Sequence, residues 1–427
     1  MKVGFIGLGK LGLPCALAVE SRGHKVIGYD PSEQVKDILD TKKLQYEEIW
    51  AQEHLDKSKI KIKSIEEVVK HSEIIFVPIQ TPHGERFEGT TRIPLERADF
   101  DYTFLKKGVK DLSDEIEKQG EDKIVIVIST VLPGTIRKEI IPLLGKHTKL
   151  CYNPFFIAMG TTMRDFLSPE IVLFGVDDSW AAKKAKRFYK TLHHSPFYET
   201  TIENAELTKV IYNTFISAKL SLVNMIQDVS EKQGNIDVDV VTDALKNSTR
   251  RIMGPSYMTA GMGDGGACHP RDNIALRWMS ENLGLGYDLF DAIMEAREIQ
   301  AMNLAEKLVR TGMDSVVIVG KAYKPHVPYE AGSYSILVGH YVEKVFGVPV
   351  YYDDDYTGDK PPEDLGPAAY LLGHDPETTF MGCLDPDPEK QGPSIFPEGS
   401  VIIDPWRKCP PIPGCQVVHY GNTRLSK

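Results

Sequence analysis

The sequence predicts an α/β protein built from two Rossmann-like, doubly wound domains that are joined by a long central helix and a helical middle domain. Short apolar runs alternate with helical patterns in the first 130 residues and again after residue 315, as in parallel sheets that helices cover on both faces. Between them, 203–233 contains neither proline nor glycine and is long enough for a helix of about 45 Å. The predicted domains are 1–200, 201–300 and 301–427.

The N-terminal strands are predicted from continuous apolar runs. A run at 2–6 leads into a glycine-rich turn, and a helical pattern over 14–22 precedes the next strand at 25–29. Further runs are EIIFVPI, KIVIVIS and EIVLFG, at 73–79, 123–129 and 170–175. Because a strand with two apolar faces must be covered on both sides, we expect all of them in one parallel sheet.

The central helix is predicted to be buried between domains or subunits, because its apolar residues occupy most of its circumference. One polar row interrupts them at spacings of three, four and seven, which keep to one face. The row is Glu206, Lys209, Asn213, Ser217, Asn224 and Asp228. Later helical patterns cover 285–310 and 340–346, and strands are expected at 315–319, 348–352, 368–372 and 400–403.

The composition excludes several classes of protein. The chain has 427 residues with 50 Lys plus Arg against 60 Asp plus Glu, a net charge of −10. This acidic balance argues against a nucleic-acid partner or an anionic membrane surface. No run of about 18 apolar residues occurs, so no membrane span is expected. The six cysteines show neither C-x-x-C pairs nor zinc-ligand spacing, so we expect free thiols, no metal site and a cytoplasmic protein.

A glycine motif follows the first strand. GLGKLG at 7–12 matches G-x-G-x-x-G and opens a helix, where glycines allow a tight turn and close approach of a pyrophosphate. Asp30 ends the next strand, where its carboxylate would bind the adenosine ribose and repel a 2′-phosphate. The motif therefore predicts NAD as the cofactor; the alternative is a plain tight turn. The predicted contacts are Gly7, Gly9, Leu11, Gly12 and Asp30.

A second candidate site is the glycine-rich segment GDGGACHPRD at 263–272. Its glycines could leave the thiol of Cys268 accessible, and Arg271 could favour the thiolate. A thiolate beside a hydride acceptor can oxidise an aldehyde through a thiohemiacetal and a thioester. The alternative is a cysteine buried as a small apolar residue.

Polar groups elsewhere could join these two sites. Lys209 and Asn213 lie four residues apart on one helix face, where an ammonium and a carboxamide could together stabilise an oxyanion. Such a pair is often solvated surface, but the apolar surroundings argue against that here. Thr81 and Thr130 each follow an apolar strand, at the sheet edge where α/β folds bind ligands. Their hydroxyls could contact the cofactor, or only form a turn and a helix cap.

Taken together, these motifs resemble the nucleotide-sugar 6-dehydrogenases of the UDP-glucose and UDP-N-acetylhexosamine type, over nearly the whole chain. The resemblance implies an N-terminal NAD-binding domain, a central helical region that forms a homodimer, and a C-terminal nucleotide-binding domain. It also implies two NAD-dependent oxidations of a UDP-hexose, from alcohol to aldehyde to acid. The motifs are GFIGLGKLGLP at 4–14, VPIQTPHG at 77–84, STVLPGT at 129–135, YNPFF at 152–156, AELTKVIYNTF at 205–215, GGACHPRD at 265–272 and GKAYKP at 320–325.

The same resemblance implies residue roles. Cys268 would be the nucleophile, Lys209 and Asn213 would contact the sugar and stabilise the oxyanion, and Asp272 would position or activate a water or the lysine. The implied further cofactor contacts are Thr81, Thr130 and Arg271. The implied substrate contacts are Phe155, Lys209, Asn213, Tyr257, Gly265 and Lys324.

The chain departs from the family pattern at three places. The family usually carries a glutamate directly after the YNP proline and another four residues later, where this chain has Phe155 and Met159. An arginine expected beyond GKAYKP is also missing, near Ala331. An apolar pair cannot transfer protons. Either Asp272 or a lysine-bound water performs the hydrolysis instead, or the protein stops at a partial oxidation or only senses a nucleotide sugar.

A β-hydroxyacid dehydrogenase is a further alternative. Those enzymes also pair a Rossmann domain with a helical domain and often use a lysine on the first long helix. They lack a third domain and the GGxC loop, so 315–427 argues against this alternative.

Overall fold

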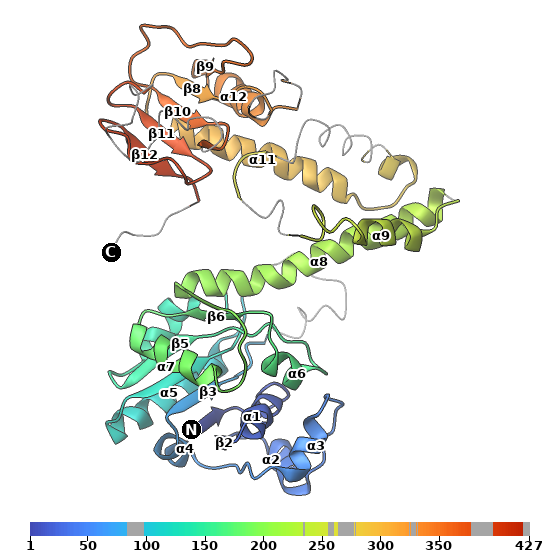
Figure 1. Ribbon diagram of the computed structural model, residues 1–427, viewed down its shortest axis with the longest axis vertical. Coiled ribbons are helices and arrows are strands. Elements are labelled where there is room, and N and C mark those ends of the chain that lie inside the picture. The colour runs from blue at the N-terminus through green and yellow to red at the C-terminus, as the bar shows by residue number, and fades with distance from the viewer. Residues whose placement is uncertain are drawn as a thin grey trace. The chain divides into compact units, whose positions relative to one another are not determined.

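The computed structural model describes residues 1–82, 98–233, 235–254, 260–263, 277, 279–323, 325, 330, 332–376 and 396–421. The chain divides into two compact units, Met1–Ala218 and Lys219–Lys427, and each has its own sheet (Figure 1). The division into three domains at 1–200, 201–300 and 301–427 stays a prediction.

Seven strands form the sheet in the described part of the N-terminal unit, in the order β2-β1-β3-β4-β5-β6-β7. The strand β1 lies between β2 and β3 and is parallel to both, so that Val3 pairs with Val26 on one side and Ile74 on the other. The loops after β1 and β3 therefore diverge at a topological switch point, where open α/β sheets bind ligands. The strands are β1 (Lys2–Ile6), β2 (Lys25–Tyr29), β3 (Ile74–Val77), β4 (Lys123–Val127), β5 (Thr148–Tyr152), β6 (Val172–Gly175) and β7 (Phe197–Thr200).

One strand prediction is wrong in direction. The run at 170–175 does form a buried strand, β6, but it pairs antiparallel with β5 through Tyr152 and Gly175. The strand β7 is parallel to β6. Two apolar faces require that helices cover a strand on both sides, but they do not determine which way the strand runs.

Helices cover both faces of this sheet, which confirms the doubly wound architecture. One apolar core contains Phe5 and Phe76, whose stacked rings lie 5.0 Å apart, and the other contains Val77 and Val125. The first core packs under α1 (Gly12–Ser21), α2 (Glu33–Thr41), α3 (Ala51–Lys57), α6 (Thr162–Leu167) and α7 (Ser179–Tyr189). The second packs under α4 (Ile65–His71), α5 (Thr103–Gln119) and the helical turn Ile136–Ile140, which continues as Ile141–Leu143.

The long central helix is confirmed as α8 (Ile202–Gln233), which passes from one unit into the other. Its first turn is anchored in the N-terminal core by Ile202 and Ala205. In the next turns of α8, a charged side chain is buried and apolar side chains are exposed, which is the opposite of the usual arrangement. The carboxylate of Glu206 is fully buried, whereas Leu207 and Ile211 are 49% and 52% exposed.

The described part of the C-terminal unit holds a five-stranded parallel sheet in the order β12-β11-β10-β8-β9. The helices α11 (Leu289–Val309) and α12 (Tyr334–Lys344) pack on one face, and Phe396 and Ile412 from loops contribute to the core on the other. A short helix, α9 (Val238–Lys246), follows α8. The strands are β8 (Val316–Val319), β9 (Val350–Asp353), β10 (Ala369–Leu372), β11 (Val401–Asp404) and β12 (Gln416–His419).

Among the helices in the described ranges, none has the length and apolarity needed to cross a bilayer.

Candidate functional site

The glycine loop after β1 has the shape that a dinucleotide needs. Gly7 has a φ of +112°, and its N–H donates to the carbonyl of Tyr29 at 2.8 Å, which closes the turn onto β2. A Cβ on Gly12 would lie 2.2 Å from the carbonyl oxygen of Gly7, so only glycine permits this packing of α1 on the strand. A Cβ on Gly9 would meet nothing within 4 Å. This open side of the loop leaves room for a pyrophosphate to approach the backbone.

Asp30 is held in place at the end of β2. Its Oδ2 accepts the N–H of Leu8 at 2.6 Å, and its Oδ1 accepts the N–H of Ser32 at 2.8 Å. Each carboxylate oxygen keeps a further lone pair for a ligand hydroxyl, and the side chain is only half-buried. The backbone thus presents an oriented negative charge beside the glycine loop, which suits two ribose hydroxyls and disfavours a phosphate.

The loops after β3 and β4 are tied together at the same edge of the sheet. The hydroxyl of Thr81 donates to the carbonyl of Thr130 at 2.6 Å, and that of Ser129 donates to the carbonyl of Ile79 at 2.5 Å. The half-buried Thr81 and Thr130 therefore lie side by side next to the switch point, as their places after two neighbouring strands predict.

Lys209 extends from α8 to the loop after β5. Its Nζ lies 5.5 Å from the ring centroid of Phe156, and burial lowers the pKa of this lysine. The ring of Tyr212 packs on the ring of Phe156, with centroids 4.8 Å apart. No carboxylate in the described part of the chain forms an ion pair with Lys209. The ammonium is therefore held by aromatic contact and remains available to a ligand. Asn213, one turn further along the helix, is exposed.

The two residues at the usual glutamate positions lie in different environments. Phe155, predicted as a substrate contact, packs its ring on Phe166 at 5.2 Å within the core and is 9% exposed. Met159 is 68% exposed. The aromatic side chain that faces Lys209 is that of Phe156, the residue directly after Phe155. Sequence reasoning missed it because adjacent loop residues carry no periodicity that separates the inward side from the outward side.

Several predicted site residues lie outside the described residues, so their roles stay predictions. They are Tyr257, Gly265, Cys268, Arg271, Asp272 and Lys324. Likewise, the ranges that the structure describes contain no group of three His, Cys, Asp or Glu residues that could hold a metal ion.

The C-terminal unit repeats the glycine–aspartate arrangement of the N-terminal unit. Gly320 follows β8 with a φ of +96°, and its N–H donates to the carbonyl of Asp353 at 2.9 Å. Asp354 follows β9, and its Oδ2 accepts the N–H groups of Lys321 and Ala322 at 2.8 and 2.9 Å. Its Oδ1 accepts the N–H of Tyr356 at 2.9 Å, just as Asp30 accepts that of Ser32. The described part of each unit therefore contains one such glycine–aspartate turn.

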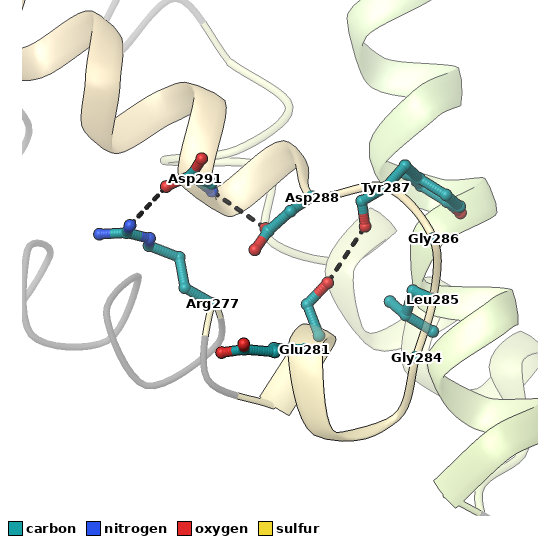
Figure 2. A pocket seen from close by; sticks show the side chains of 9 residues that line it. Arg277, Glu281, Gly284, Leu285, Gly286, Tyr287, Asp288 and Asp291 are labelled. Carbon is teal, nitrogen blue, oxygen red and sulfur yellow. Dashed lines mark hydrogen bonds and ion pairs between the residues drawn. The ribbon is translucent and has the colours of Figure 1, made fainter.

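A cavity of about 600 Å³ in the C-terminal unit contains none of the predicted site residues (Figure 2). Its charged groups are largely engaged with one another. Arg277 pairs with Asp291 at 2.5 Å, and Asp288 caps α11 by accepting the N–H of Asp291 at 3.0 Å. The hydroxyl of Ser280 donates to the carbonyl of Tyr287 at 3.1 Å. These bonds shape the turn before α11.

Two profiles of one known protein family match this chain. Residues 1–193 match the profile described as "UDP-glucose/GDP-mannose dehydrogenase family, NAD binding domain", and 203–298 match the central domain of the same family. Together the two profiles match more than half of the chain.

Individual relatives are more distant. A GDP-mannose 6-dehydrogenase of Pseudomonas aeruginosa is 25% identical over 337 residues, which cover 76% of this chain and 74% of that protein. The UDP-glucose 6-dehydrogenase TuaD of Bacillus subtilis is 27% identical over 341 residues, with coverage of 76% and 70%. A ternary complex of a GDP-mannose dehydrogenase from P. aeruginosa matches in fold with a TM-score of 0.83 at 20% identity, covering 98% of this chain and 99% of that one.

Proposed function

Because this chain belongs to the UDP-glucose/GDP-mannose dehydrogenase family, we propose that it oxidises the C6 hydroxyl of a nucleotide-activated hexose to the uronic acid, with UDP-glucose or a related UDP-sugar as substrate. The chain is an NAD-dependent nucleotide-sugar dehydrogenase. The observation that best supports the proposal is the position of Lys209. Its amine is half-buried at the sheet edge that also carries the glycine loop, Asp30 and the Thr81–Thr130 contact.

The N-terminal residues fit the cofactor. The open side of Gly9 accommodates the pyrophosphate, and the oriented carboxylate of Asp30 suits the ribose of NAD and repels the 2′-phosphate of NADP. When bound, NAD supplies the hydride acceptor in both oxidations. Overall, one alcohol, one water and two NAD⁺ give one carboxylate, two NADH and three protons.

The chain's own residues would divide the chemistry as follows. The C6 hydroxyl would lose its proton to water and the first hydride would leave C6 for the cofactor, while the ammonium of Lys209 and the carboxamide of Asn213 donate hydrogen bonds to the C6 oxygen. The sulfur of Cys268 then bonds to the aldehyde carbon, which gives a thiohemiacetal, and loss of the second hydride from that carbon leaves a thioester. Water breaks the carbon–sulfur bond, releases the acid and restores the thiol. Asp272 is the group we assign to that water, since Phe155 and Met159 cannot move a proton.

A second copy of this chain is the partner we propose for α8. Three apolar residues of α8 lie one turn apart on one face of the helix and are about half exposed. They are Leu207, Ile211 and Phe215, at 49%, 52% and 49%. An apolar helical row of this length is usually covered by another surface. One chain has a mass of 47.8 kDa, and we expect sedimentation equilibrium to give twice that mass for the unaltered protein. The variant Ile211→Glu should give the mass of one chain. A single-chain mass for the unaltered protein at micromolar concentration contradicts the homodimer.

The proposed function is tested by counting NADH. The full chain is incubated with NAD, or with NADP as the comparison, and with a set of UDP- and GDP-hexoses, while sugar acid and NADH are measured together. We expect at least one sugar to give two NADH for each acid formed, with NAD much preferred over NADP. One NADH for each sugar consumed would support partial oxidation, the outcome that the missing glutamates make the strongest competitor. No NADH with any sugar contradicts the proposed oxidation.

A further inference from the structure

Glu206 is a carboxylate buried completely on the first part of α8, and its two oxygens bind one loop. Its Oε2 accepts the N–H of Gly134 at 2.6 Å, and its Oε1 accepts the N–H of Ile136 at 2.7 Å. Gly134 and Ile136 belong to the segment that follows β4, a few residues after Thr130. The carboxylate of Glu206 therefore accepts hydrogen bonds from two backbone N–H groups that would otherwise lack a partner in this loop.

Within the described residues, no ion pair neutralises the charge on Glu206. The charge of Arg137 acts on Glu206, but the guanidinium itself binds Glu203 and, at 2.9 Å, Asp177. Burial raises the pKa of Glu206, while the two backbone N–H groups act in the opposite direction. A buried carboxylate without a cation is costly to keep in a protein interior. Glu206 is therefore better explained by what it holds than by a gain in stability.

The two ends of this contact belong to different parts of the candidate site. The loop at 129–135 carries Thr130, whose carbonyl accepts the hydroxyl of Thr81 on the cofactor side. One helical turn after Glu206, Lys209 lies against Phe156. The carboxylate thus connects the loop that adjoins the cofactor to the helix that carries the sugar-facing amine.

We propose that Glu206 is a positioning residue that holds the loop at 129–135 in register with Lys209, so that the cofactor and the C6 oxygen meet at the correct separation. The contact of this loop with NAD is the one predicted from the sequence for Thr130, and the link to Lys209 rests on the proposed function. Small displacements of reacting groups cost large factors in rate, because the orientation of both partners must be correct at once.

The test is the near-isosteric change Glu206→Gln in the full chain. The amide replaces one acceptor by an NH₂ group that faces a backbone N–H, so one of the two bonds is lost. We expect the affinity for NAD, measured by calorimetric titration, to fall at least fivefold. With a nucleotide sugar that the unaltered protein oxidises, we expect kcat to fall about tenfold while KM for the sugar changes less than threefold.

The matched control is Glu203→Gln, one turn earlier on the same helix. Its side chain is 39% exposed and binds Arg137 at the surface, so NAD affinity and kcat should stay as in the unaltered protein. Circular dichroism confirms that each variant is folded, and Glu206→Asp, which keeps the charge on a shorter stem, serves if the glutamine variant does not fold.

The outcomes separate this proposal from the proposed function. Unchanged NAD affinity in folded Glu206→Gln, or in Glu206→Asp where that variant is used, overturns the positioning role, as does an equal loss in Glu203→Gln. If the unaltered protein oxidises no sugar at all, the proposed function fails, and the NAD titration still decides the role of Glu206 for the loop.

Discussion

Replacing Cys268 by alanine is expected to limit the yield to one NADH for each sugar and to lower the rate of acid formation about a thousandfold or more. Without the thiol, the aldehyde cannot be captured as a covalent adduct, and the second hydride has no tetrahedral carbon–sulfur intermediate from which to leave. Removing an enzyme's nucleophile typically causes losses of this size or larger, because the other catalytic groups act only together with it.

The measurement for this prediction is a single-turnover reaction with excess enzyme and NAD. Mass spectrometry of the sugar should show the aldehyde or its hydrate in the variant and the uronic acid in the unaltered protein. Cys415→Ser is the control, since that half-buried thiol lies 3.5 Å from the carbonyl of Pro397 in the C-terminal unit and has no part in the proposal. Two equivalents of NADH from Cys268→Ala at the original rate would exclude the covalent mechanism.

Replacing Lys209 by methionine should lower kcat by about 10²- to 10³-fold, because the change removes the charged donor to the C6 oxygen and keeps the volume of the side chain. Little effect on folding is expected. The amine lies against Phe156 and, within the described residues, pairs with no carboxylate whose charge the variant would leave uncompensated. Lys219→Met, at an exposed position on the same helix, is the control and should retain full activity.

The pH dependence gives a second readout for the same residue. Burial lowers the pKa of Lys209, so its ammonium form is lost at a lower pH than that of an ordinary lysine. If the ammonium is the active form, kcat falls as the pH rises through that lowered pKa, and the alkaline limb lies below the usual lysine range. The ring of Phe156 lies against the amine, and the ring of Tyr212 packs on Phe156. An alkaline limb that is identical in Lys209→Arg, whose guanidinium keeps its proton, would assign the limb to another group.

The absence of glutamate at positions 155 and 159 has a structural consequence as well as a chemical one. Phe155 contributes its ring to the core against Phe166, a place where an ionised carboxylate would be costly to bury. In the proposed mechanism, the hydrolysis of the thioester therefore depends on groups other than residues 155 and 159. This is why the count of NADH, together with the nature of the product, is more informative for this chain than activity alone.

The sequence by itself determined the features that depend on neighbouring residues. The glycine loop, Asp30 at the end of the second strand, the buried strands and the helix over Ile202–Gln233 follow from local patterns, because periodicity and backbone freedom act within a few residues. The family resemblance also followed from short motifs in a characteristic order, and the two family profiles confirm it.

Only the tertiary structure decided which distant groups meet. The antiparallel direction of β6, the choice of Phe156 over Phe155 as the neighbour of Lys209, and the binding of Gly134 and Ile136 by Glu206 all join residues far apart in the chain. In the sequence, Glu206 is one member of a polar row. Its complete burial and its two backbone partners result from the packing of α8 against the segment that follows β4. A local pattern shows that a polar group lies on a given face, but the group that it binds depends on packing between elements, which no short-range periodicity contains.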